Sequence, residues 1–251
     1  MITGINSFRE QFKDMEDQYA IIGGTACDLL MSEAGEDFRA TKDFDIVLII
    51  ESLTPEFGKR FWDYITKAGY EHKNKSTGNP QFYRFSHPVS GEYPFMIELF
   101  SRKPDFLTAP QNLVLTPLPI DDEISSLSAI LLDDDYYDFI KGGITKIDGV
   151  SIIDAIHLIP LKAKAWSDLS AKKENNSAPV DSKDIKKHKN DIYRLTTLLT
   201  AETQITLTKE IYDDVQTFID AIENDDINLK QIGIKMSLQD IVERLRTAYI
   251  F

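Results

Sequence analysis

Cysteine and histidine are scarce in this 251-residue chain, which contains one cysteine, Cys27, and four histidines. A single cysteine excludes an internal disulfide, and no Cys/His cluster suggests a zinc site. Long apolar runs are also missing, because the longest, residues 44–50, is interrupted by Asp45 and falls far short of the roughly 20 residues that span a bilayer. The N-terminus lacks the basic-then-apolar pattern of a signal peptide. We therefore expect a cytoplasmic protein that does not enter a membrane.

Positive charge is in short supply, since 28 Lys and Arg stand against 41 Asp and Glu, for a net charge of −13. Such an acidic surface repels phosphate backbones, so we expect no broad non-specific DNA binding. One local concentration of basic residues is either a nucleic-acid contact or a solvated helix face. It consists of Lys183, Lys186, Lys187, Lys189 and Arg194.

The first 150 residues mix helical and strand patterns, and 42% of the whole chain is apolar, enough for a sizeable core. Apolar spacing predicts helices over residues 5–16, 25–30 and 55–68, the last beginning at Pro55. Strands are expected over residues 19–22, 43–50, 81–85 and 95–100, with shorter ones around residues 113 and 127–132. We expect an α+β domain over residues 1–150.

The pattern becomes purely helical after residue 150. Ser151 and Asp154 resemble a capping box, which predicts a helix to about Leu169, bent at Pro160. The polar composition of residues 171–182 predicts a loop, and further helices are expected over residues 182–199, 207–223 and 237–248. The sequence therefore predicts an all-helical domain over residues 151–251.

Two glycines, Gly23 and Gly24, stand between a predicted strand and a helix that opens at Thr25. Glycine lets the backbone approach a bulky anion closely, and a helix N-terminus presents free N–H groups and a positive dipole end. Such turns are also common in ordinary cores. The motif is therefore a candidate phosphate cradle or a plain structural turn.

Asp43 and Asp45 begin a predicted strand, so their side chains share one face, while Phe44 and Ile46 point into the core. Adjacent carboxylates repel unless a cation lies between them, and a hard divalent cation with oxygen ligands suits that position. The alternative is a pair of exposed acids at a strand start.

Glu98 is a lone charge in the apolar segment PFMIELF, where Phe95, Ile97 and Leu99 define the opposite face. A carboxylate there is costly to bury without a partner. If this strand neighbours the Asp43 strand, the three carboxylates can hold two Mg²⁺ ions, and Glu98 can help deprotonate an attacking hydroxyl. Otherwise Glu98 is an edge-strand residue that faces water. The basic residues Lys42 and Arg84 either contact phosphate or balance the acids.

The order of IIGGTACDLL, KDFDIVL and MIELF resembles the nucleotidyltransferase superfamily typified by DNA polymerase beta. That resemblance implies a mixed, twisted sheet with helices on one side. It also implies a reaction in which a nucleoside monophosphate moves from an NTP to a hydroxyl with release of pyrophosphate. Mg²⁺ would be held by Asp43, Asp45 and Glu98, and the triphosphate by Gly23, Gly24 and Thr25.

The GGTA spelling, LKAKAW and KHKNDIYRL resemble the bacterial AbiEii-type nucleotidyltransferase toxins, over roughly residues 18–199. The resemblance implies that the helical half supplies a Lys and an Asp to the cleft. Lys162 lies on the apolar helix face, where a lysine needs an anion such as a triphosphate, whereas Lys164 faces water and can pair with Asp168. We favour Lys162. Asp191 either orients Lys162 or the substrate hydroxyl, or forms a surface pair with Lys187.

By this resemblance the chain is a toxin of a toxin–antitoxin or phage-defence pair that modifies RNA such as tRNA. Two alternatives remain. The acceptor is instead a small molecule, as in enzymes that adenylylate aminoglycosides, since an acidic surface attracts a cationic antibiotic. Otherwise the chain is a non-catalytic interaction protein that keeps the fold.

Overall fold

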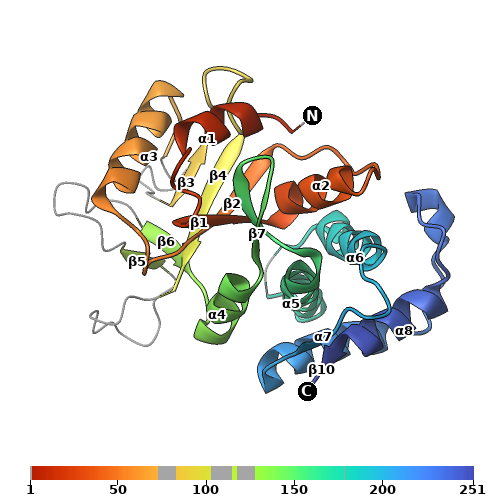
Figure 1. Ribbon diagram of the computed structural model, residues 1–251. Helices are drawn as coiled ribbons and strands as arrows, with labels where there is room; N and C mark the ends of the chain where they lie inside the picture. Colours follow the sequence, from red (N-terminus) through yellow and green to blue (C-terminus); the bar gives the residue numbers. More distant parts are fainter. Residues whose placement is uncertain (1, 73–82, 103–114, 118–127, 178) are drawn as a thin grey trace. The chain divides into compact units, whose positions relative to one another are not determined.

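The computed structural model describes residues 2–72, 83–102, 115–117, 128–177 and 179–251 (Figure 1). The chain divides into two compact units. The sheet unit comprises Met1–Glu33 and Asp37–Ile153, and the helical unit comprises Ala34–Glu36 and Asp154–Phe251. The large sheet and several helices lie in the first unit, whereas the second unit is mainly helical, and the predicted α+β fold class is confirmed. That residues 1–150 and 151–251 are independent domains stays a prediction.

A mixed sheet of eight strands, counted over the described residues, forms the frame of the sheet unit. Seven follow the order β5-β6-β4-β2-β1-β8-β7, and β3 pairs with β4. Strand β2 runs antiparallel to β1 and parallel to β4, so its predicted carboxylates lie in the interior of the sheet. The bounds are β1 Tyr19–Ile22, β2 Asp43–Leu48, β3 Arg84–Ser86, β4 Met96–Ser101, β5 Leu115–Pro117, β6 Ser128–Leu131, β7 Ile144–Ile147 and β8 Val150–Ile153.

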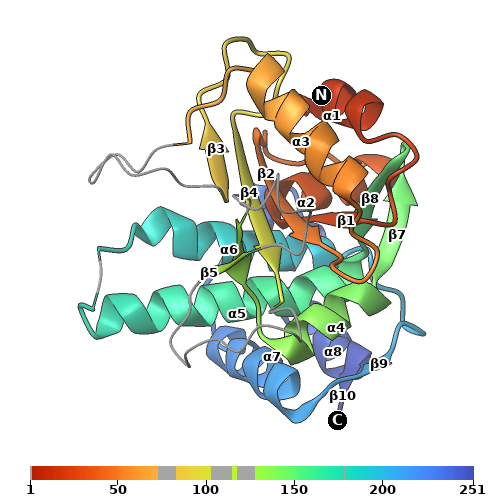
Figure 2. The ribbon, with the colours of Figure 1, turned by 90° about the vertical axis from the view of Figure 1, so that its left-hand side faces the viewer.

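Helices α1 (Ile5–Gln11) and α3 (Pro55–Lys67) lie side by side over one face of the sheet (Figures 1 and 2). An aromatic cluster fills the space beneath them. The ring centroids of Phe8 and Phe44 are 5.4 Å apart, and those of Phe12 and Phe57 are 5.2 Å apart. Because Phe44 points into this core, the aspartates on either side of it project from the opposite face.

Two elements of the sheet unit differ from the sequence-based expectation. Strands β7 and β8 form a hairpin around Asp148 and Gly149, both with positive φ, where a helix from Ser151 was expected. Ser151 is instead buried in β8, where its hydroxyl donates to the backbone carbonyl of Glu16. The unexpected helix α4 (Asp134–Gly142) precedes the hairpin. Helix α2 (Gly23–Glu33) forms as expected but begins at Gly23 and not at Thr25, so both glycines belong to its first residues. The Pro55 start of α3 matches the expectation, and the strand expected around residue 113 lies outside the described residues.

The helical unit is built from α5, α6, α7 and α8, a short 3₁₀ turn η2, and the parallel pair β9–β10. The bounds are α5 Ala155–Glu174, α6 Ser182–Thr196, α7 Lys209–Ile222, η2 Leu229–Ile232, α8 Leu238–Ala248, β9 Ile205–Thr206 and β10 Tyr249–Ile250. Asp154, not Ser151, caps α5: its carboxylate accepts from the His157 backbone N–H at 3.0 Å. No helix in the described ranges is long and apolar enough to cross a bilayer.

Candidate active site

The turn from β1 into α2 is shaped by a close approach between Gly23 and Asp45. Gly23 has φ +70°, and a Cβ built on it would lie 2.0 Å from Oδ2 of Asp45. A side chain at this position would therefore displace the carboxylate, and the left-handed φ also favours glycine. Thr25, fully buried two residues further on, donates its hydroxyl to the Asp43 backbone carbonyl at 2.8 Å. These contacts fix the N-terminus of α2 against the start of β2.

Asp43 has an unusual environment for a carboxylate at a strand start. Its Oδ1 is inaccessible to solvent and has no hydrogen-bond partner in the described part of the chain. A buried carboxylate oxygen without a partner is costly, since nothing replaces the water that it has lost. A bound cation would satisfy this oxygen. The orphaned oxygen of Asp43 therefore fits a hard divalent ion with oxygen ligands.

Asp45, Glu98 and Arg84 form a row across three neighbouring strands, which we call the cross-strand row. Asp45 pairs in register with Glu98 on β4, and Glu98 pairs in register with Arg84 on β3. The sequence-based condition for joining Glu98 to the aspartates, that β4 neighbours β2, is met. Paired Cα positions on adjacent strands put these side chains next to one another on one face.

Arg84 balances a carboxylate of this row. Its Nη2 lies 2.6 Å and its Nε 2.7 Å from the same oxygen, Oε1 of Glu98. Glu98 is 13% exposed and Arg84 47% exposed. Of the two roles left open for Arg84, phosphate contact or charge balance, the structure shows the second. Lys42 lies over the Phe95 ring, with 3.9 Å from Nζ to the centroid.

A second arginine, Arg39, lies at the turn and was not among the sequence-based candidates. A Cβ built on Gly24 would lie 3.2 Å from Nη2 of Arg39 and 3.1 Å from Cγ2 of Thr41. A guanidinium beside the N-terminus of a helix is a suitable neighbour for a phosphate group. The signal in the sequence is weak: Arg39 belongs to an aperiodic segment between Gly24 and Asp43.

Lys162 and Asp191 form a buried ion pair inside the helical unit. Nζ of Lys162 lies 2.9 Å from Oδ2 of Asp191, and the two side chains are 4% and 0% exposed. Asp191 therefore contacts Lys162 rather than standing on the surface beside Lys187. Removing two charges from water is costly, so this pair is held by its mutual attraction and by the surrounding fold.

Lys164 is the more exposed of the two candidate lysines. It is 34% exposed and forms an ion pair at 3.2 Å with Asp214 of α7, rather than the expected pair with Asp168 in the same helix. Burial lowers the pKa of Lys164, but the hydrogen bond that Lys164 donates to the Asp214 carboxylate outweighs burial and raises that pKa overall. Lys164 thus has a structural partner in its own unit.

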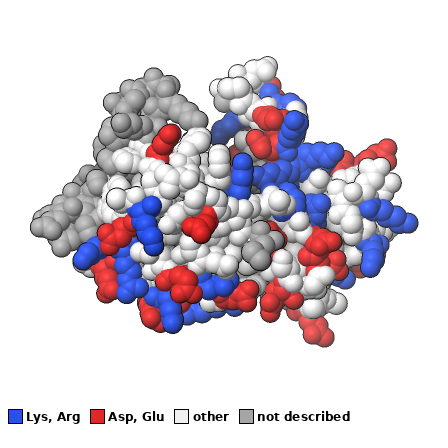
Figure 3. Space-filling view, turned by 90° about the horizontal axis from the view of Figure 1, so that it is seen from above, with Lys and Arg blue, Asp and Glu red and all other residues white. Residues whose placement is uncertain are grey.

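The basic concentration expected from the sequence falls on α6. Lys183, Lys186 and Lys187 are exposed, and their three- and four-residue spacing puts them on neighbouring positions of the helix surface. Lys189 is instead held by Asp225 at 2.6 Å. Figure 3 shows Lys and Arg side chains beside Asp and Glu side chains on the face that it presents. A net negative charge is therefore compatible with local basic surface.

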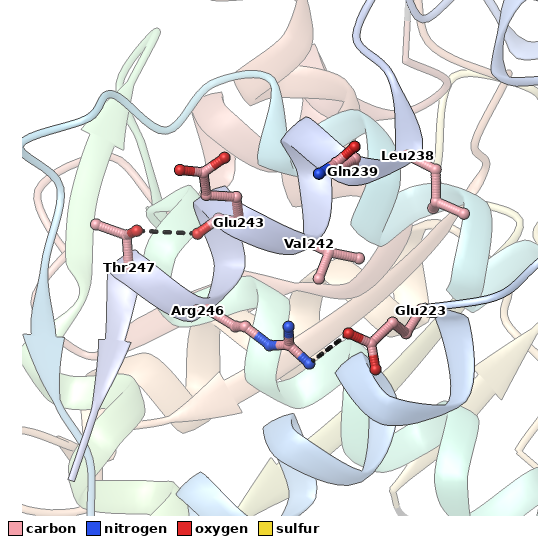
Figure 4. Close-up of a pocket in the computed structure, with 7 residues that line it drawn as sticks. All are labelled: Glu223, Leu238, Gln239, Val242, Glu243, Arg246 and Thr247. Carbon is pink, nitrogen blue, oxygen red and sulfur yellow. Dashed lines mark hydrogen bonds and ion pairs between the residues drawn. The ribbon is translucent and has the colours of Figure 1, made fainter.

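A cavity of about 690 Å³ lies on the helical unit, between the end of α7 and α8 (Figure 4). An ion pair of 3.0 Å between Arg246 and Glu223 crosses it, and Leu238 and Val242 supply apolar wall. None of the site residues expected from the sequence lines this cavity. The expected site residues lie elsewhere: Gly23 to Thr25, Asp43, Asp45 and Glu98 in the sheet unit, and Lys162 and Asp191 in the helical unit.

The fold of the chain is similar to that of a solved nucleotidyltransferase-like protein. The chain is similar to the crystal structure of an antigenic nucleotidyltransferase-like protein from Paracoccidioides brasiliensis, with a TM-score of 0.53 and 14% sequence identity. The likeness covers 98% of this chain and 92% of that protein. No protein-family model matches the chain, and no curated protein matches it at a significant level.

Proposed function

We propose that this chain is a Mg²⁺-dependent nucleotidyltransferase that moves a nucleoside monophosphate from an NTP to a hydroxyl acceptor. The observation that carries the proposal is the buried Oδ1 of Asp43, which has no hydrogen-bond partner among the described residues and lies two residues before Asp45 of the cross-strand row. A structural turn alone has no need of an unsatisfied carboxylate, whereas a divalent cation site does.

The roles follow from the positions of the side chains. Asp43 and Asp45 hold the cation, whose charge would stabilise the phosphate oxygens during transfer. Gly23 and Gly24 let the triphosphate approach the N-terminus of α2, and Thr25 keeps that terminus in place through its bond to Asp43.

Glu98 pairs with Asp45 from the neighbouring strand, and we propose that it is the general base that accepts the proton of the acceptor hydroxyl. The acceptor oxygen attacks the α-phosphorus, its proton passes to Glu98, and the bond to pyrophosphate breaks. On the resemblance of the sequence motifs alone, we also assign to Lys162 the neutralisation of charge that develops on the phosphates.

The acceptor that we propose is RNA such as tRNA, in a cytoplasmic toxin of the AbiEii type with an antitoxin partner. The resemblance of the sequence motifs supports this role, and so do the exposed lysines of α6, since clustered lysines attract a phosphate backbone. Lys183, Lys186 and Lys187 are exposed, and the ion pairs of α6 within the described ranges involve Lys189 and Asp191 instead.

The test measures NTP binding by calorimetry, with Mg²⁺ and with EDTA, and then transfer of labelled nucleotide to total RNA and to a small-molecule fraction. Asp43→Asn should abolish Mg²⁺-dependent binding, whereas Asp63→Asn, at an exposed position of α3, should leave it intact. Label in RNA supports the proposal in full. Label in the small-molecule fraction alone would show that the acceptor is a small molecule and not RNA. No binding of ATP, GTP, CTP or UTP refutes the enzyme and favours a non-catalytic interaction protein.

A further inference from the structure

The hairpin of α5 and α6 ends in a basic, exposed surface. A hydrogen bond of 2.6 Å from Nζ of Lys173 to Oγ of Ser182 joins the C-terminus of α5 to the N-terminus of α6. Figure 2 shows the two helices side by side, with their joined ends extending beyond α7. Each residue from 171 to 177 is exposed, so the last turn of α5 is open to solvent.

Five exposed lysines, which we call the hairpin lysines, share this end of the hairpin. Those on α6 recur at three- and four-residue spacing, which puts them on one face of the helix. Lys189, further along α6, is held by Asp225 at 2.6 Å, whereas no ion pair in the described ranges holds a hairpin lysine. The hairpin lysines are Lys172 and Lys173 of α5 and Lys183, Lys186 and Lys187 of α6.

The charge of this surface is opposite to that of the chain. Residues 171–187 contain the five lysines and three acids, Glu174, Asp181 and Asp184, in a chain of net charge −13. Asp181 caps α6, since its carboxylate accepts from the Lys183 backbone N–H at 2.9 Å. A local concentration of positive charge attracts a polyanion, while the acidic remainder of the surface repels it. The surface therefore fits a phosphate backbone that contacts the protein at this place.

Aromatic side chains are missing from the same stretch, because residues 171–187 include no Phe, Tyr or Trp. Proteins that hold single-stranded nucleic acid stack its bases on aromatic side chains. A base-paired RNA stem instead presents phosphates and 2′-hydroxyls, which lysines and polar side chains contact without reading the sequence. Asn175 and Asn176 supply exposed polar groups beside the lysines. The composition of the hairpin end thus favours a base-paired stem over a single strand.

We propose that the hairpin lysines dock the phosphate backbone of a base-paired RNA stem, independently of its sequence. This inference deepens the proposed function and rests on it for the role of that RNA as the acceptor. It assigns the binding of the acceptor to one hairpin of the helical unit. It also assigns the choice of acceptor to RNA structure and not to base sequence.

Fluorescence anisotropy over a range of salt concentrations tests this docking. The probes are a labelled RNA stem-loop, a second stem-loop with a scrambled stem sequence, and oligouridine of the same length, all without NTP. The glutamine variant is Lys172→Gln/Lys183→Gln/Lys186→Gln/Lys187→Gln, and the arginine variant is Lys172→Arg/Lys183→Arg/Lys186→Arg/Lys187→Arg. Lys230→Gln/Lys235→Gln serves as the control, because both lysines are exposed in the same unit but lie outside the hairpin. Melting curves confirm that each variant is folded.

We expect wild type, the arginine variant and the control to bind both stem-loops equally well and oligouridine more weakly. The glutamine variant should bind the stem-loops at least about tenfold more weakly. Its plot of log affinity against log salt should be less steep by about 3–4, roughly one for each lost phosphate contact. The inference would be overturned if the glutamine variant bound as wild type does, if the control lost as much affinity, or if oligouridine bound more tightly than the stem-loops.

Two further measurements separate this inference from its alternatives. Polyglutamate that displaces the stem-loop as effectively as unlabelled RNA would show that the surface fits an acidic protein equally well, and would also overturn the inference. NTP binding by calorimetry reports on the proposed function by itself. Wild type that binds NTP but no stem-loop would overturn the inference alone, whereas docking of the stem-loop without any NTP binding would refute the proposed function and leave the docking surface standing.

Discussion

Replacement of Gly23 by alanine tests whether the β1–α2 turn and the cation site are one unit. The built Cβ lies 2.0 Å from Oδ2 of Asp45 and 3.0 Å from its Cγ, too close for any real contact. The left-handed φ of +70° costs an alanine about 1–2 kcal/mol. The overlap either costs about 1–3 kcal/mol more or is relieved by moving the Asp45 carboxylate.

Gly149→Ala is the matched control in the same unit. Its φ is +73°, but the nearest atoms to its built Cβ lie 3.6 Å away, at an ordinary contact distance. Both variants therefore carry the backbone strain, and only Gly23→Ala carries the clash. Urea denaturation measures the loss of stability, and Mn²⁺ titration measures the state of Asp45.

We expect Gly23→Ala to lose more stability than Gly149→Ala, to bind Mn²⁺ at least about tenfold more weakly, or both. Gly149→Ala should bind Mn²⁺ as wild type does. If Gly23→Ala matches Gly149→Ala in stability and wild type in Mn²⁺ affinity, then Gly23 does not shape the cation site and the reasoning is wrong.

Three further predictions concern buried and partly buried polar groups. Lys162→Met should lower the free energy of unfolding by about 3–5 kcal/mol, because it leaves the Asp191 carboxylate buried without its partner lysine. Lys162→Met/Asp191→Leu should recover most of that loss in urea denaturation. A single variant as stable as wild type would contradict the burial of the pair. Thr25→Val should lower the free energy of unfolding by about 1–2 kcal/mol, because the hydrogen bond to the Asp43 carbonyl is lost. Thr25→Ser keeps the hydroxyl and should lower it less. Glu51 is partly buried, which raises its pKa, but hydrogen bonds from Tyr137, Lys141 and Arg102 outweigh burial and lower that pKa to about 2. The stability that it contributes is present above its unfolded pKa and should be lost as the pH falls towards 2, so Glu51→Gln should flatten the acid limb of the stability–pH curve; an identical limb would contradict this.

The carboxylates of the sheet were predictable because strand periodicity is a local property. Two residues apart on one strand, Asp43 and Asp45 share a face whatever the rest of the chain does, and Phe44 between them marks the core side. Glu98 was recognisable as a lone charge in an apolar strand. Its place beside Asp45 depended on which strands pair, and only the folded sheet shows that.

The residues that the sequence left undecided depend on long-range pairing. Arg84 faces Glu98 because β3 folds back on β4, and no local pattern distinguishes that contact from a phosphate contact. Asp191 pairs with Lys162 from another helix, where local spacing offered Lys187 as an equally good partner. Arg39 lies in a segment without periodicity, so no local sequence pattern predicts its approach to Gly24.

The β7–β8 hairpin is a different case, because its signal was present in the sequence. Asp148 and Gly149 form a two-residue turn between apolar segments, which is a strong local hairpin pattern. The Ser151–Asp154 spacing competed with it as a helix start. Asp154 is indeed a helix cap, so the helix begins four residues later than the first member of that motif.

The placement of β2 between β1 and β4 couples ligand affinity to the integrity of the whole sheet. Its neighbours come from residues 19–22 on one side and 96–101 on the other, so the cation ligands assemble only when segments distant in sequence have paired. An ion that binds only the assembled form raises the unfolding free energy of the unit in proportion to the logarithm of its concentration. A fragment that ends before β4 would keep both aspartates and the glycine turn, yet lose the strand that holds them in register.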